Sequence, residues 1–150
     1  MEEVKENNPD NPKKPKAPDG LGRLIGMASA VVLVIAAFLP WGETGFFTVT
    51  GIDGDGIITI GIAVVAFVML AIQKVPLWIT IILGVLAAAI GIIDFMEMSS
   101  ASEELALDMA GDEFAESIQI TVGSGLYLTI LAGVGLIAGP IVGYIQKRKK

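Results

Sequence analysis

Residues 56–94 read GIITIGIAVVAFVMLAIQKVPLWITIILGVLAAAIGIID, and this stretch decides the fold. It consists of two apolar runs that are separated only by Gln73-Lys74-Val75-Pro76. Crossing about 30 Å of hydrocarbon takes about 20 apolar helical residues, and each run is close to that length. The short link therefore predicts an antiparallel hairpin of two membrane spans. Pro76 fits the first turn of the second span, where its missing N–H is not needed.

Further apolar runs flank this hairpin on both sides, so the sequence predicts four spans, at about 21–39, 56–73, 76–94 and 121–145. Hydrophobic residues make up 53% of the chain of 150 residues, and the mean hydropathy is +0.71. A soluble domain of this size cannot bury so much apolar surface, so we expect lipid to cover the excess. The predicted fold class is an all-α membrane protein, a four-transmembrane-helix bundle.

Basic residues set the predicted orientation. All ten lysines and arginines lie before or at the start of the first span, in the link 73–76, or at the C-terminal end. The predicted outer loops 40–55 and 95–120 contain none, whereas both carry acidic residues. Cytoplasmic segments of membrane proteins are enriched in lysine and arginine. We therefore predict a multi-pass protein of the plasma (cytoplasmic) membrane with both termini cytoplasmic.

The two ends of the chain are polar. Residues 1–20 hold four of the seven prolines and charges of both signs, which predicts a disordered cytoplasmic tail. Residues 147–150, Lys-Arg-Lys-Lys, form a polybasic cytoplasmic tip. The net charge of −6 argues against a nucleic-acid partner. The expected partners are the lipid bilayer and either another membrane or envelope protein or a second copy of the chain.

Small residues at helical spacing predict where the spans pack, because they let a second helix approach closely. Such faces occur in spans one, three and four, as Gly22, Gly26 and Ala30; Gly84, Ala88 and Gly91; and Gly135, Gly139 and Gly143. These faces serve either packing within the bundle or a homodimer. With four spans available, the sequence favours packing within the bundle.

The segment 50–56, TGIDGDG, opens the second span. Asp53 and Asp55 alternate as in a calcium loop, but Ile57 and Val64 occupy the later ligand positions. A tight glycine turn in which Asp55 caps the second span explains both the aspartate and its place. Asp53 and Asp55 stay as candidate cation ligands, and we predict no other metal site and no cofactor.

Aromatic residues follow the first span. Trp41 is predicted to anchor the membrane interface, which is the usual place for tryptophan in membrane proteins. The run 46–50, FFTVT, combines aromatic and β-branched residues and predicts a short strand or an extended pass over the helices. A lip that binds a ligand is the alternative interpretation of these aromatic residues.

The largest predicted element outside the membrane is an acidic amphipathic helix that begins at Ser102. Its hydroxyl would cap the helix, with glutamates in the first turn. One face is apolar, with Leu107, Ala110, Gly111, Phe114 and Ile118, and the other is acidic, with Glu104, Asp108, Asp112, Glu113 and Glu116. The apolar stripe is expected to cover the bundle, and the acidic face is a candidate for docking a basic partner.

The chain has no cysteine and no histidine, which removes the thiolate nucleophile, the usual general base and the commonest metal ligands. No ionisable residue lies near the middle of a predicted span, which argues against proton relays, voltage sensors and ion-coupled transporters. We therefore expect a non-catalytic protein, either an accessory subunit or an envelope-associated scaffold. Two alternatives stand beside it: a small channel or carrier for a neutral or lipophilic molecule, and a lipid-modifying enzyme that uses Asp53, Asp55 and Asp94.

Three short motifs resemble a loose group of small four-span bacterial membrane proteins, common in actinobacteria and other Gram-positive bacteria. They are Leu39-Pro40-Trp41, Gly51-x-x-Gly54-Asp55-Gly56 and Gly125-Leu126-Tyr127-Leu128-Thr129. The resemblance implies a four-span membrane domain, and it brings no activity, cofactor or site residue with it. The arrangement is also similar in outline to that of claudins, but their W…C…C signature is broken here because the chain has no cysteine.

Overall fold

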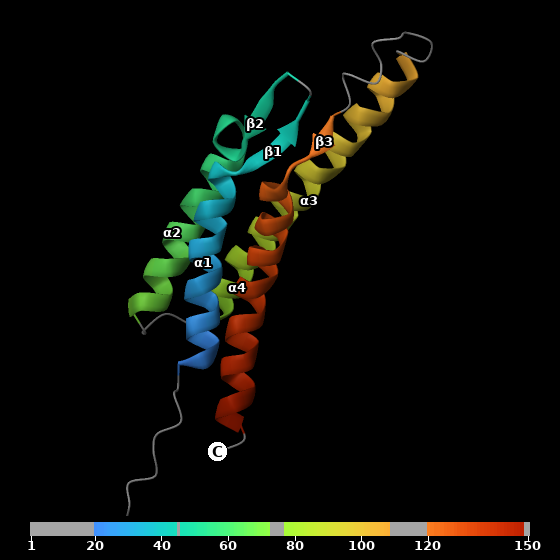
Figure 1. Cartoon of the computed structure of the whole chain (residues 1–150). Coiled ribbons are helices and arrows are strands. Elements are labelled where there is room, and N and C mark those ends of the chain that lie inside the picture. Colours follow the sequence, from blue (N-terminus) through green and yellow to red (C-terminus); the bar gives the residue numbers. More distant parts are fainter. Residues whose placement is uncertain (1–19, 45, 73–76, 109–119, 149–150) are drawn as a thin grey trace, which may run out of the picture.

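The computed structural model of the chain describes residues 20–44, 46–72, 77–108 and 120–148. In chain order the elements are α1 (Leu21–Phe38), β1 (Pro40–Glu43), β2 (Thr48–Thr50), the 3-10 helix η1 (Gly51–Asp53), α2 (Gly56–Ile72), α3 (Leu77–Asp108), β3 (Thr121–Val122) and α4 (Ser124–Arg148). The three strands lie together at one end of the helix bundle (Figure 1), which we call the sheet end. Residues 1–19 of the predicted tail 1–20 and the link 73–76 lie outside the described residues.

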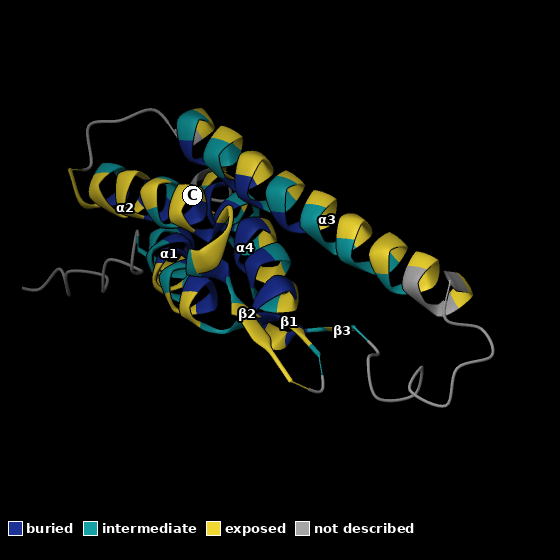
Figure 2. Ribbon diagram, turned by 90° about the horizontal axis from the view of Figure 1, so that it is seen from above, coloured by how far each residue is buried: buried dark blue, intermediate teal, exposed yellow. Residues whose placement is uncertain are grey.

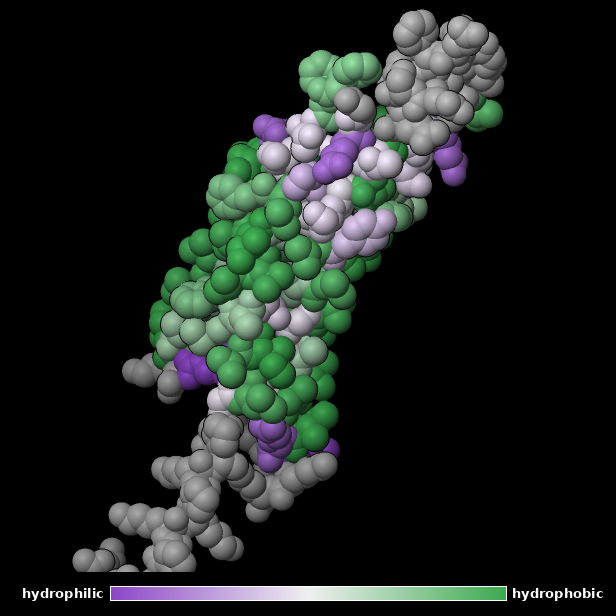
Figure 3. Space-filling model, in the orientation of Figure 1, coloured by the Kyte–Doolittle hydropathy of each residue, from purple (hydrophilic) through white to green (hydrophobic). Residues whose placement is uncertain are grey.

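Three of the helices are long and apolar enough to cross a membrane. They are α1, α3 over Trp78–Glu104 and α4 over Ser124–Gln146. The shorter α2 is also apolar and has 17 residues. Many large apolar side chains are exposed along the helices, and they cover the face drawn in Figure 3. The protein is therefore embedded in a membrane.

The helices α1 and α4 form the centre of the bundle and run antiparallel, because α1 begins and α4 ends away from the sheet end (Figure 1). Gly22 lies against the backbone of Gly139 and Gly143, and Gly135 lies against Ser29. Helix backbones that approach so closely gain van der Waals contact along their whole length. The main contact of the bundle is therefore made by small residues.

On either side of this pair, α2 packs mainly on α1, and α3 packs mainly on α4. Figure 2 shows buried residues on the sides of the helices that face one another. The buried core combines leucines from α1, α2 and α4 with alanines from all four helices: Leu33, Leu70, Leu136, Ala30, Ala63, Ala66, Ala87 and Ala132. Small side chains at these positions keep the helices close.

A three-stranded antiparallel sheet, in the order β2-β1-β3, joins the loop after α1 to the segment before α4. Glu43 of β1 pairs with Thr48 of β2 on one side and with Thr121 of β3 on the other. The run 46–50, predicted as a short strand or an extended pass, contains β2, but the all-α fold class omits the sheet. The residues of β1, PWGE, show no strand alternation, and β3 has only two residues, so these strands depend on tertiary contacts. β1 pairs with β2 and lies against α4, and β3 pairs with β1 and lies against α3.

The third span differs from its prediction, because α3 continues past Asp94 as one helix to Asp108. Residues 95–108 contain no glycine or proline and several good helix formers, so nothing interrupts the helix. The prediction that a separate acidic helix starts at Ser102 is therefore wrong, because Ser102 lies inside α3. The Ser102 hydroxyl lies within α3 and donates to the carbonyl of Ser99 (2.6 Å). Residues 109–119, with the rest of the predicted stripe and acidic face, lie outside the described residues.

Candidate functional site

Carboxylates gather at the sheet end of the protein. They are Glu43, Asp53, Asp55, Asp94, Glu97, Glu103 and Glu104. Among the described residues, the basic side chains Arg23 and Arg148 belong to the first turn of α1 and the last turn of α4. The two ends of the bundle therefore carry opposite charge. In Figure 3, residues of low and intermediate hydropathy form a purple and pale zone at the sheet end.

Trp41 holds the sheet to the ends of the helices. Its indole N–H donates to the carbonyl of Ala36 (2.9 Å), and only 3% of the residue is exposed. Gly51 of η1 and Gly125 of α4 lie against the ring so closely that a side chain at either position would overlap it. The prediction that Trp41 anchors the lipid interface is thus corrected. The chain turns back over α1 at Pro40, which directs the ring into the protein.

The loop before α2 is held by Asp53 rather than by Asp55. The Asp53 carboxylate accepts hydrogen bonds from the Thr50 hydroxyl (2.7 Å) and the Thr50 backbone N–H (3.0 Å). These two bonds, the hydroxyl first, lower the pKa of Asp53 from its ordinary value. Asp55 contributes its backbone carbonyl, which accepts from the N–H groups of Ile58 and Thr59. The predicted cap by the Asp55 side chain is not among the hydrogen bonds of the described residues.

The three carboxylates considered for catalysis come from two parts of the sheet end. Asp94 lies in α3, whereas Asp53 lies in η1 and Asp55 lies directly before α2. One carboxylate oxygen of Asp94 is buried and has no hydrogen-bond partner among the described residues. Asp53 is instead engaged by Thr50. The described part of the chain contains no group of three or more His, Cys, Asp or Glu side chains that could hold a metal ion.

The predicted small-residue faces lie against helices of the same chain. Beyond the contacts of Gly22, Gly135, Gly139 and Gly143, a side chain at Gly26 would meet Leu70 of α2, and one at Gly91 would meet Thr129 and Ile130 of α4. Gly84 and Ala88 of α3 face Gly133 of α4, and Ala30 is buried in the core. These faces are therefore occupied within one chain. Sequence reasoning did not single out Gly133 or Leu70, because their partners are distant in sequence.

Three hydroxyl groups within the bundle are used by their own helices. Thr59 donates to the carbonyl of Gly56 (2.8 Å), Thr129 to that of Gly125 (2.9 Å) and Ser29 to that of Ile25 (2.8 Å). A hydroxyl that is bonded to its own helix backbone has little capacity left for a ligand. These three groups therefore serve the helices rather than a polar path through the membrane.

The end of α3 projects beyond the other helices. Its exposed face is apolar as far as Met96, and then carries the exposed carboxylates of Glu97, Glu103 and Glu104. From Glu97 to Asp108 the helix rises about 18 Å, at about 1.5 Å per residue. Figure 1 shows this extension passing β3 and leaving the bundle. Of the predicted docking residues, Glu104 and Asp108 belong to the extension, whereas Asp112, Glu113 and Glu116 lie outside the described residues.

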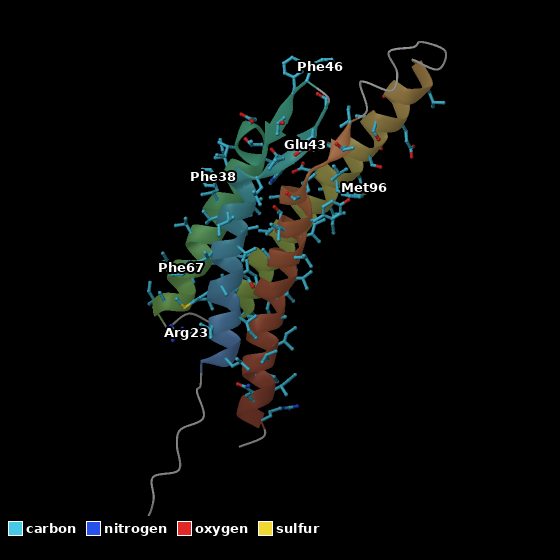
Figure 4. All side chains as sticks on the ribbon, viewed as in Figure 1. Arg23, Phe38, Glu43, Phe46, Phe67 and Met96 are labelled. Atoms are coloured by element: carbon cyan, nitrogen blue, oxygen red, sulfur yellow. The ribbon has the colours of Figure 1, made fainter. Side chains whose placement is uncertain are left out.

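At the other end of the bundle, Arg23 joins α1 to α2. Its guanidinium donates to the carbonyls of Leu70 and Ala71 in the last turn of α2, and Figure 4 shows the side chain at that end. The last carbonyls of a helix have no partner within the helix, and a cation is favoured there. Spacing along the sequence carries no signal for this contact, because Arg23 lies in a different helix.

Comparison of the chain with models of protein families, with curated proteins and with solved structures finds no match. A fold alone does not determine a function. The function is therefore argued from the residues of the sheet end and from the way the helices pack.

Proposed function

We propose that this protein is a non-catalytic membrane protein that crosses the plasma membrane four times with both termini in the cytoplasm. It serves as an accessory subunit or an envelope-associated scaffold. The observation that carries the proposal is the extension of α3, which presents carboxylates well beyond the bundle. The sheet end is then the outer end, and the extension reaches a partner outside the membrane.

The fourth crossing is assigned to α2. Its 17 residues span about 25 Å, and a helix slightly shorter than the hydrocarbon is accommodated by local thinning of the bilayer. Its side chains Ala63, Ala66 and Leu70 lie in the same core as those of α1 and α4. Arg23 bonds its last carbonyls, which would otherwise be costly near hydrocarbon. These contacts support a membrane position beside α1.

The non-catalytic role is supported by how the polar groups are used. The buried hydroxyls of Thr59 and Thr129 bond their own helices, and Asp53 is bonded to Thr50. General acid–base and nucleophilic mechanisms need a base within hydrogen-bond reach of the group that it activates. Among the side-chain hydrogen bonds of the described residues, the hydroxyl that is bonded to a carboxylate is that of Thr50. The same Asp53 carboxylate also accepts the Thr50 backbone N–H, so this pair holds the turn before α2. The bundle is instead organised around close helix contacts.

Charge reversal on the α3 extension tests the proposal. The test variant carries both Glu103→Lys and Glu104→Lys. The control variant carries both Glu2→Lys and Glu3→Lys, so it has the same net charge but leaves the extension intact. The tagged full chain is isolated from native membranes in mild detergent, and co-purifying proteins are quantified by mass spectrometry. We expect a partner that co-purifies with the unchanged chain and the control and is reduced several-fold with the α3 variant. Isolation of a solitary chain from native membranes would contradict the proposal.

A further inference from the structure

We propose that Phe46 and Phe47, at the tip of the β1–β2 hairpin, bind a partner protein through an apolar surface bordered by basic side chains. We call these two residues the hairpin tip. The inference rests on the proposed function and deepens it, because it names a contact point and the chemistry of the partner. It uses a different element from the α3 extension, so the two can be tested separately.

Both rings of the hairpin tip are exposed to solvent. The exposed fractions are 75% for Phe46 and 76% for Phe47, among the highest of the large apolar residues. Figure 4 shows Phe46 at the far end of the hairpin, directed away from the helices. In Figure 3 the green atoms at this place are separated from the green helical surface by pale and purple atoms. Lipid around the helices therefore does not account for the two phenylalanines.

The backbone of the hairpin tip is held in place by Thr44. The Thr44 N–H donates to the carbonyl of Phe47 (2.7 Å), and the Thr44 hydroxyl oxygen accepts from the Phe47 N–H (3.0 Å). These bonds fix the turn before any partner binds, which lowers the entropy lost on association. Aromatic side chains held in this way are typical of the residues that dominate protein interfaces.

The charges at the sheet end select the chemistry of the partner. Glu43 is exposed at the end of β1 next to the hairpin tip, Asp53 is exposed on η1 after β2, and Glu97 is exposed on the neighbouring α3. This negative surface repels anionic lipid headgroups and also repels the sheet end of a second copy. It attracts a partner surface that carries lysine or arginine. An apolar surface with a basic border is therefore complementary to the hairpin tip in both hydrophobicity and charge.

Site-specific photocrosslinking in native membranes tests this inference. Phe46→p-benzoylphenylalanine and Phe47→p-benzoylphenylalanine place an aromatic crosslinker at the hairpin tip with little change in side-chain character. The matched control is Phe67→p-benzoylphenylalanine, because Phe67 is an exposed phenylalanine on the membrane surface of α2. Adducts of the full chain are isolated and the crosslinked peptide is sequenced by mass spectrometry.

We expect the hairpin-tip probes, and not the Phe67 probe, to give one protein adduct that maps to an apolar segment flanked by lysine or arginine. Adding Glu43→Gln to the probe variants should reduce the yield of this adduct by about threefold or more, because a charged attraction is lost. Adducts to lipid, to a second copy or to an acidic segment would overturn the inference, as would the absence of a protein adduct. If a partner still co-purifies through the α3 extension in those cases, the proposed function stands without the hairpin contact.

Discussion

At the scale of single residues, Gly22 and Gly61 form a matched pair, since both are helical glycines with opposite surroundings. A side chain at Gly22 would overlap the backbone of Gly139 and Gly143, whereas Gly61 has nothing within 4 Å of the position of an added side chain. Gly22→Ala should therefore destabilise the protein by about 1–3 kcal/mol, because backbone cannot move aside. Gly61→Ala should be neutral or stabilise by up to about 1 kcal/mol, because alanine favours the helix.

Unfolding of both variants in detergent or bicelles, followed by circular dichroism, measures this difference. The unchanged chain serves as the reference, and the order of the three stabilities is the outcome that matters. Equal stability of Gly22→Ala and Gly61→Ala would mean that α1 and α4 do not approach as closely as the structure describes.

Individual residues also show how far sequence reasoning reaches. The spacing of Gly135, Gly139 and Gly143 is visible in the sequence, because a helix places positions i and i+4 on one face. The partner of that face is not visible, because it depends on which helices become neighbours. The orientation of Trp41 was missed for the same reason: the turn at Pro40 and the small residues Gly51 and Gly125, which receive the ring, become a pocket only after folding.

At the scale of elements, the junction of β2 and η1 depends on pH through Asp53. Bonds from Thr50 hold the pKa of this carboxyl below its ordinary value. A lowered pKa in the folded state means that the stabilisation is complete above the ordinary pKa. It is lost as the pH falls through the lowered value, because protonation weakens both bonds. We expect hydrogen exchange at the Thr50 N–H, corrected for its intrinsic pH dependence, to become faster in that acidic range.

The variant Asp53→Asn isolates this effect, because it removes the titrating group and keeps the shape of the side chain. Its corrected exchange at Thr50 should be faster at neutral pH than in the unchanged chain and should no longer respond to acid. An unchanged acid response in Asp53→Asn would assign the titration to another group.

The end of α2 is a second element whose stability depends on one side chain. Arg23 donates to the carbonyls of Leu70 and Ala71, so Arg23→Gln should weaken the last turn of α2 by about 1–2 kcal/mol. Because the chain has no native cysteine, Ile72→Cys provides a clean reporter there. Its reaction with a maleimide should be several-fold faster with Arg23→Gln than with Arg148→Gln. Equal rates in the two variants would show that the contact does not stabilise α2.

Elements differ in how well their bounds follow from the sequence. The apolar run 56–73 predicts α2 (Gly56–Ile72), because glycine and a polar link mark its ends. The run 76–94 predicts only the more apolar first part of α3, because hydropathy falls at Asp94 while helix propensity does not. A fall in hydropathy marks the end of an apolar segment. It does not mark the end of the helix when the helix continues into water. The sheet depends on pairings between strands of two to four residues, which are too short for a period-2 pattern.

At the scale of the whole molecule, the number of membrane crossings determines whether the two termini lie on the same side of the membrane. If α2 crosses along with α1, α3 and α4, the number is even and both termini lie on the same side. If α2 does not cross, the number is odd and the termini lie on opposite sides. The basic residues near both ends favour the first case, because cytoplasmic segments are enriched in lysine and arginine.

Single cysteines introduced into the cysteine-free chain decide between these cases. We expect a membrane-impermeant maleimide to label Ser100→Cys on the α3 extension of intact cells, and to label Glu3→Cys and Arg148→Cys only after the membrane is opened. Labelling of all three positions after permeabilisation is the control for reactivity. If one of the two terminal cysteines is labelled in intact cells and the other is not, α2 does not cross. The proposed four-span arrangement, with the acidic sheet end outside and the basic opposite end in the cytoplasm, would then be wrong.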